Sequence, residues 1–157
     1  MSTYRNYKQT DIKFTNKAIS LANESFQKST FPAGALIAKD NKIISKSTSF
    51  AFPKFNHHPE SASIDAAMDK LNKELKDCIL YTSIEPCLMC LCKAYWAGIR
   101  KIYFAIKKES VSCKYYESNV NNYDILKKFN KRIKLIHVKS LEHRALEIIK
   151  KWEKKNS

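Results

Sequence analysis

The chain has 157 residues, long enough for one compact domain that buries a core without disulfide bonds. Hydrophobic residues make up 44% and charged residues 28%, a globular composition that excludes a disordered chain. The formal net charge of +14 would suit a polyanionic partner such as nucleic acid. However, only four of the 29 basic residues are arginines. A general lysine-rich composition would give the same net charge without a dedicated binding face.

The hydrophobic pattern predicts helices and strands along the whole chain. Helices show apolar residues every three or four positions, and strands are short apolar or alternating runs. Asp40 and Asn41 are turn residues, Pro86 suits the first turn of a helix, and Gly98 suits its end. In chain order we expect a helix over 11–27, strands over 35–38 and 42–45, a helix from the His58-Pro59-Glu60 triplet, a strand over 78–83, a helix from 86 to about 97, a strand over 101–106, a helix over 120–129, a strand over 132–138 and a helix over 141–152.

This order predicts an α/β fold in which helices cover both faces of a central five-stranded mixed sheet. Strands that are separated by a crossover helix should run parallel. Because no repeat, low-complexity tract or linker divides the sequence, we expect a single domain over residues 1–157. No apolar run reaches the ~18 residues of a membrane-spanning helix, and the polar N-terminal segment has no signal-peptide core. We therefore expect a cytoplasmic protein with no membrane partner.

The cysteines point to metal or redox chemistry. Their number, five, is odd, and the chain shows no secretory signal, so a disulfide framework is not expected. Cys87, Cys90 and Cys92 fall within six residues, as metal ligands or redox thiols do. Cys78 and Cys113 are interpreted as small apolar residues.

Two short motifs carry the chemistry: His58-Pro59-Glu60 and Pro86-Cys87-Leu88-Met89-Cys90. Each opens a predicted helix, and a parallel sheet would bring the two helix starts together at one edge. His58, Cys87 and Cys90 would supply three ligands, which is the number of an open catalytic zinc site, because the fourth tetrahedral position is left for water. The exposed N–H groups at a helix start favour the thiolate form that binds metal.

Glu60 lies two positions after His58, close to the predicted metal without being a ligand. It could take a proton from zinc-bound water and pass it to a leaving amine. Zinc lowers the pKa of its water to about 7, so hydroxide is available at neutral pH. The hydroxide would attack an amino-bearing ring carbon, and ammonia would leave.

Other interpretations exist for the same residues. His57 could replace His58 as a ligand, but only His58 stands two positions from Glu60, so His57 is placed near the mouth of the site. The two cysteines could form a redox pair, or a closed structural zinc site with Cys92 or His57 as fourth ligand; Cys92 falls on the wrong side of a helix for this. Glu60 could simply cap its helix.

The spacing of the motifs is the H-x-E…P-C-x-x-C signature of zinc-dependent base deaminases. Residues 80–104 resemble the corresponding block of the cytidine deaminase superfamily, and the segment Ala94-Tyr95-Trp96-Ala97 is similar to its guanine deaminase and tRNA adenosine deaminase-like branch. Residues 31–40 and 145–155 resemble the first strand and the C-terminal helix of that branch. The resemblance implies a three-layer α/β/α sandwich, a homodimer with sites near the interface, and hydrolytic deamination of a base, nucleoside, nucleotide or tRNA anticodon.

Two positions depart from that family. It often has alanine between the histidine and the glutamate, with a backbone N–H that can donate to a substrate carbonyl, whereas Pro59 has no N–H. Purine deaminases of the family tend to place an asparagine about eleven positions before the histidine, where this chain has Ser47. The Ser47 hydroxyl could hydrogen-bond a base. We expect Trp96 to pack in the core, with base stacking as its alternative role.

The basic run over residues 127–134 is expected to be a solvated face, with phosphate binding as the alternative. Three hypotheses about function result. The first is a zinc-dependent deaminase of a purine or pyrimidine base, nucleoside or nucleotide, similar to guanine deaminase. The second is a tRNA adenosine-to-inosine deaminase whose basic surface holds RNA. The third is a zinc-stabilised nucleic-acid-binding protein without catalysis.

Overall fold

Five strands form one mixed sheet in the computed structural model, which describes residues 7–49 and 57–157. The spatial order is β2-β1-β3-β4-β5. β1 runs antiparallel to both of its neighbours, whereas β3, β4 and β5 are parallel to one another. The strands are β1 (Gly34–Lys39), β2 (Lys42–Thr48), β3 (Ile79–Ile84), β4 (Lys101–Ile106) and β5 (Lys134–His137). The predicted five-stranded mixed sheet is confirmed.

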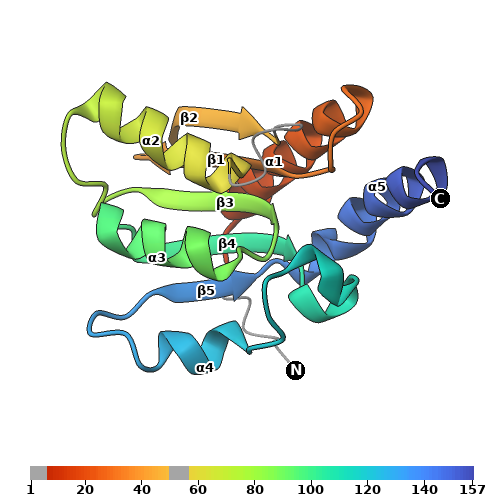
Figure 1. Cartoon of the computed structure of the whole chain (residues 1–157). Coiled ribbons are helices and arrows are strands. Elements are labelled where there is room, and N and C mark those ends of the chain that lie inside the picture. Colours follow the sequence, from red (N-terminus) through yellow and green to blue (C-terminus); the bar gives the residue numbers. More distant parts are fainter. Residues whose placement is uncertain (1–6, 50–56) are drawn as a thin grey trace, which may run out of the picture.

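Helices cover both faces of the sheet, which gives the three-layer α/β/α sandwich expected from the resemblance (Figure 1). One layer holds α1 and α5, and the other holds α2, α3 and the short α4. Their bounds are α1 (Gln9–Gln27), α2 (Pro59–Leu71), α3 (Leu88–Ala97), α4 (Asn122–Leu126) and α5 (Glu142–Lys155), with single 3-10 turns over Lys108–Ser110, Cys113–Tyr115 and Lys139–Leu141. Within the described ranges, no helix is long and apolar enough to cross a membrane.

Local sequence signals explain the β1–β2 hairpin and the close packing of α1. Asp40 and Asn41 both have positive φ, 50° and 61°, as the tight two-residue turn of a hairpin requires. Gly34 begins β1 directly under α1, where an added Cβ would lie 2.4 Å from the Ala18 carbonyl oxygen and 2.5 Å from the Leu21 Cβ. Only glycine allows this approach.

The core holds α2 and α3 in fixed positions against the sheet. Ile37 of β1, Ile64 of α2, Leu91 of α3 and Phe104 of β4 are all fully buried in one cluster. Each such side chain contributes roughly 1.5–3 kcal/mol by leaving water. The first residues of α2 and α3 are thereby fixed beside the carboxyl end of β3.

Three expectations about local structure were wrong. Cys87 caps α3, which begins at Leu88 rather than Pro86, because Pro86 lies in a loop and its carbonyl accepts a hydrogen bond from Asn122. The helix expected over 120–129 ends at Leu126, because the chain turns there and the Phe129 ring packs 5.1 Å from the Tyr95 ring. Trp96 is 82% exposed rather than buried, because α3 turns its other face toward the sheet.

Candidate active site

The two sequence motifs meet at the carboxyl end of β3. His58 is the N-cap of α2 and Cys87 is the N-cap of α3, and both have extended backbones, with φ near −75° and ψ of 155° and 170°. Cys90 follows in the first turn of α3 and is fully buried. Both helices therefore present a side chain from the residue that precedes their first turn.

The three side chains have the arrangement that zinc needs. His58 Nδ1 lies 3.4 Å from the Cys87 Sγ and 3.6 Å from the Cys90 Sγ. Zinc bound tetrahedrally at ~2.0–2.1 Å from nitrogen and ~2.3 Å from sulfur would place these atoms about 3.5 Å apart. The three ligand atoms all lie within 4.8 Å of one another, and no other such group occurs among residues 7–49 and 57–157. The donor set and its spacing fit zinc.

The closed structural site receives no support from this geometry. Cys92 is exposed on the outer side of α3, and all five cysteines are free. Neither Cys92 nor His57 belongs to the cluster of possible ligands found among the described residues. The number of clustered ligands, three, is that of an open site.

The two thiols differ in acidity. Hydrogen bonding from Cys90, together with the bond to His58, lowers the pKa of the Cys87 thiol to about 5 despite its burial. The pKa of Cys90 is raised, because it shares a hydrogen bond with Cys87 and is buried near Glu60. One thiolate is therefore stable at neutral pH in this pair, and the charge of a bound cation would favour the second.

Glu60 lies in the first turn of α2 and is only 4% exposed. Its Oε1 accepts a hydrogen bond of 3.0 Å from the Thr82 hydroxyl of β3, and its Oε2 lies 3.9 Å from the Cys90 Sγ. Burial raises the pKa of the Glu60 carboxyl. A carboxyl beside the ligand cluster with a raised pKa is suited to hold and release a proton.

A cavity of about 140 Å³ opens onto these residues. His58, Glu60 and Cys87 are among the residues that line it, together with three aromatic residues. The aromatic residues are Phe31, Tyr115 and Tyr116. Trp152 of α5 supports this wall from behind, with its ring 5.2 Å from Phe31 and 6.2 Å from Tyr115. The cavity is small and largely apolar, so a planar ring fits it better than a large polar ligand.

The two residues predicted to contact substrate do not line this cavity. Ser47 lies within β2, paired with Ala35, and Trp96 lies on the exposed face of α3. Ser49, two positions beyond Ser47, lines the cavity instead. The counting rule that pointed to Ser47 assumes a loop of fixed length before His58, and residues 50–56 of that loop lie outside the described ranges. His57 lines the cavity, where it was expected.

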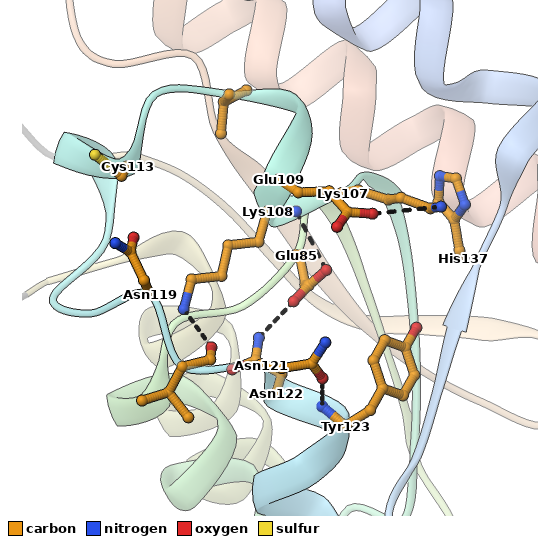
Figure 2. Close-up of a pocket in the computed structure, with 12 residues that line it drawn as sticks. Glu85, Lys107, Lys108, Glu109, Cys113, Asn119, Asn121, Asn122, Tyr123 and His137 are labelled. Atoms are coloured by element: carbon orange, nitrogen blue, oxygen red, sulfur yellow. Dashed lines mark hydrogen bonds and ion pairs between the residues drawn. The ribbon is translucent and has the colours of Figure 1, made fainter.

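Sequence reasoning missed the residues that hold the Cys87 loop. The Asn122 amide donates 2.6 Å to the Glu85 Oε2 (Figure 2). It also donates 3.0 Å to the Pro86 carbonyl. The Tyr116 hydroxyl donates 2.6 Å to the Glu85 carbonyl. Glu85 is buried, which raises the pKa of its carboxyl. These contacts join segments more than 30 positions apart, and no local pattern marks them.

The part of the chain that carries this site is similar in sequence to known deaminases. Residues 8–106, which include both motifs, match the sequence profile of the cytidine and deoxycytidylate deaminase zinc-binding region. Over 96 residues the chain is 38% identical to the guanine deaminase of Bacillus subtilis (strain 168), covering 59% of this chain and 62% of that protein. Over 95 residues it is 35% identical to the tRNA-specific adenosine deaminase of Aquifex aeolicus (strain VF5), covering 59% of this chain and 63% of that protein.

The alignments thus span less than two thirds of either relative. The similarity extends further in three dimensions. The X-ray structure of the guanine deaminase from Bacillus subtilis superposes with a TM-score of 0.61 at 31% identity, over 91% of this chain and 93% of that one.

Proposed function

The chain belongs to the family of the cytidine and deoxycytidylate deaminase zinc-binding region, and on this premise we propose that it is a zinc-dependent hydrolase that deaminates a purine or pyrimidine base or its nucleoside. The observation that carries the proposal is the position of Glu60, which is buried beside the His58, Cys87 and Cys90 cluster and lines a ring-sized cavity. A structural metal site has no need of a buried carboxyl that is not a ligand.

In the proposed reaction, His58, Cys87 and Cys90 hold the metal. Zinc, when bound there, supplies a water molecule whose pKa is lowered to about 7. Glu60 takes a proton from the attacking water and passes it to the departing nitrogen, while Thr82 keeps the carboxylate oriented. A C–O bond forms at the amino-bearing ring carbon, the C–N bond breaks, and ammonia is released. The aromatic wall orients the ring and excludes water.

A base or nucleoside is favoured as substrate by the size of the cavity, about 140 Å³. The 38% identity to a guanine deaminase supports a guanine-like base. A tRNA adenosine deaminase is the second candidate, supported by the 35% identity to such an enzyme and by the net charge of +14. The third hypothesis, a protein without catalysis, leaves the placement of Glu60 unexplained.

Ammonia release from a panel of bases, nucleosides, nucleotides and unmodified tRNA tests the proposal. We expect release from at least one ring substrate by the zinc-loaded protein, and a loss of roughly 10²–10⁴-fold in Glu60→Gln. If no compound of the panel releases ammonia, the proposed deaminase activity is refuted. Activity that persists in Glu60→Gln would instead refute Glu60 as the proton carrier.

We also propose that the protein forms a homodimer through the outer face of α3. Trp96 is 82% exposed and Met89 is 41% exposed on this helix, and Met68 of the neighbouring α2 is 36% exposed. Apolar side chains of this size on two adjacent helices suit a self-complementary interface. Light scattering after size exclusion should give twice the chain mass of 18.2 kDa, and Trp96→Glu should give a monomer. A monomeric wild type would contradict the dimer.

A further inference from the structure

Three hollows follow one another beyond the active-site cavity. The first, of about 690 Å³, is the pocket shown in Figure 2, and it adjoins the active-site cavity because Glu85 lines both. The second, of about 660 Å³, shares Tyr123 with the first. The third, of about 330 Å³, shares Lys101, Arg132 and Lys134 with the second. We call these three hollows the lateral track.

The lateral track leads away from the reacting centre. The active-site cavity lies at the carboxyl end of β3, whereas Lys101 and Lys134 are the first residues of β4 and β5, which run parallel to β3. A strand of six residues is roughly 20 Å long. The far end of the track is therefore at the opposite edge of the sheet, and substitutions there leave the catalytic groups untouched.

The far part of the track is strongly cationic. Six lysines and arginines line the second and third hollows, and Asp77 is the one carboxylate among their described lining residues. Lys101, Arg132 and Lys134, which lie between the two hollows, take part in none of the ion pairs found within residues 7–49 and 57–157. Unpaired cations gathered in one place repel one another, and an external polyanion would relieve that repulsion.

Aromatic side chains stand among these cations. Tyr123 is 42% exposed at the boundary between the first and second hollows, and the half-buried Phe129 lines the second; Tyr103 also lines the second but is only 3% exposed, so it offers no face for stacking. Aromatic faces between cations are the means by which proteins bind single-stranded nucleic acid, since each unpaired base can stack while the phosphates contact lysine and arginine. The bases of a duplex are already stacked and cannot enter separate hollows.

We propose that the lateral track binds single-stranded nucleic acid, with phosphates at Lys101, Arg132 and Lys134 and a base stacked on Tyr123. This surface goes beyond the proposed deamination and does not depend on it. It also assigns a role to the basic run of the sequence over residues 127–134, which the active site does not use.

Fluorescence anisotropy with a labelled 12-nucleotide RNA strand tests the proposal, with a DNA strand of the same sequence and an RNA duplex as comparisons. We expect both single strands to bind more tightly than the duplex; the RNA-to-DNA ratio identifies which strand is preferred. Between 50 and 200 mM KCl, the logarithm of the affinity should fall linearly with the logarithm of the salt concentration, by about 0.7 per phosphate contact. Glu60→Gln should bind as wild type does, which separates this test from that of the deaminase.

A matched pair of triple variants locates the binding surface. Lys101→Ser with Arg132→Ser and Lys134→Ser should lower the affinity at least tenfold and reduce the salt slope by about 2, for three lost phosphate contacts. The control variant removes three exposed lysines at the β2 edge of the sheet and should change the affinity less than twofold. Its substitutions are Lys42→Ser, Lys46→Ser and Lys70→Ser.

Replacement of Tyr123 tests the stacking. Tyr123→Ala should weaken the binding of the single strand about tenfold. Tyr123→Phe keeps the ring and should bind the strand with wild-type affinity. The proposal is overturned by absence of binding at 50 mM KCl, by a duplex that binds as tightly as the single strands, or by equal losses in the two triple variants. The last result would show that only the overall charge matters.

Discussion

The Thr82 hydroxyl lies 3.0 Å from the Glu60 Oε1 and 3.1 Å from the Ile84 carbonyl oxygen, with all three groups buried. A hydroxyl has one hydrogen, so it can donate to only one of these oxygens at a time. Thr82 can donate to an ionised Glu60, or accept from a protonated Glu60 while donating to Ile84. The residue therefore accommodates both forms of the carboxyl without moving.

Thr82→Val keeps the shape of this side chain and removes its hydroxyl. Loss of a hydrogen bond to a charged group, about 1.5–3 kcal/mol, should lower kcat roughly 10–100-fold, with little change in KM and the same zinc content. Thr82→Ser keeps the hydroxyl and should recover most of the activity. A Thr82→Val enzyme with wild-type kcat would show that Glu60 needs no support from β3.

Metal analysis distinguishes the cysteines. We expect one zinc per chain in the wild type and none in Cys87→Ser, because the serine hydroxyl is a poor replacement for a zinc-bound thiolate. Cys92→Ser is the matched control and should keep its zinc, since Cys92 is exposed outside the ligand cluster. Zinc retained by Cys87→Ser, or lost by Cys92→Ser, would mean that the ligands are assigned wrongly.

Asn122→Ala removes the amide that holds the loop before Cys87. Glu85 and Pro86 each lose a buried hydrogen bond, so the free energy of unfolding should fall by about 2 kcal/mol. Zinc affinity should fall roughly 10–100-fold, as it does when a group that orients a ligand is lost. Thermal unfolding and competition with a chromophoric chelator measure the two effects. The exposed Asn119→Ala is the control, and equal zinc affinities in both variants would disprove the role of Asn122.

Tyr81 gives a pH-dependent prediction far from the metal. Its hydroxyl donates 2.6 Å to the buried Asp11 Oδ1, and burial followed by this bond raises the pKa of the phenol well above its usual value near 10. The folded chain thus binds the phenolic proton more tightly than the unfolded chain does. This stabilisation is complete below pH 10 and is lost as the pH rises beyond it.

Tyr81→Phe should lower the free energy of unfolding by about 1–3 kcal/mol at pH 8, because the buried Asp11 Oδ1 loses its donor and Asp11 keeps only the bond from the Lys8 backbone N–H to its Oδ2. The difference between the free energies of unfolding of the two proteins should become smaller above pH 10. There the wild type loses the stabilisation from the Tyr81 phenol, and the variant has no such contribution to lose. Urea unfolding at pH 8 and pH 10.5 measures both values. A constant difference would contradict the raised pKa of Tyr81.

Local signals in the sequence were enough to place the ligand cluster. Pro59 occupies the first position of α2, Gly98 ends α3 with a φ of 99°, and the turn at Asp40 and Asn41 forms the hairpin. Each of these residues acts on its own neighbours, so its effect can be predicted without knowledge of the fold. The crossover helices then bring His58 and Cys87 to the same edge of the sheet.

Contacts between distant segments could not be predicted in this way. Thr82 lies 22 positions from Glu60, and Asn122 lies 37 positions from Glu85, so only the completed fold brings the partners together. The prediction that Trp96 is buried was wrong for a different reason. α3 has apolar residues on nearly every side, and its pattern does not show which of them faces the sheet.

His58 and Cys87 stand 29 positions apart and both offer a ligand atom to the same metal. A shared zinc ion would close the intervening chain into a loop, and loss of that restraint gives the unfolded chain more freedom, equivalent to about 3.6 kcal/mol by the entropy of a loop of this length. A chelator would then lower the melting temperature as well as remove the reaction. Inactivation by chelation consequently reports on catalysis only at temperatures where the metal-free chain is still folded.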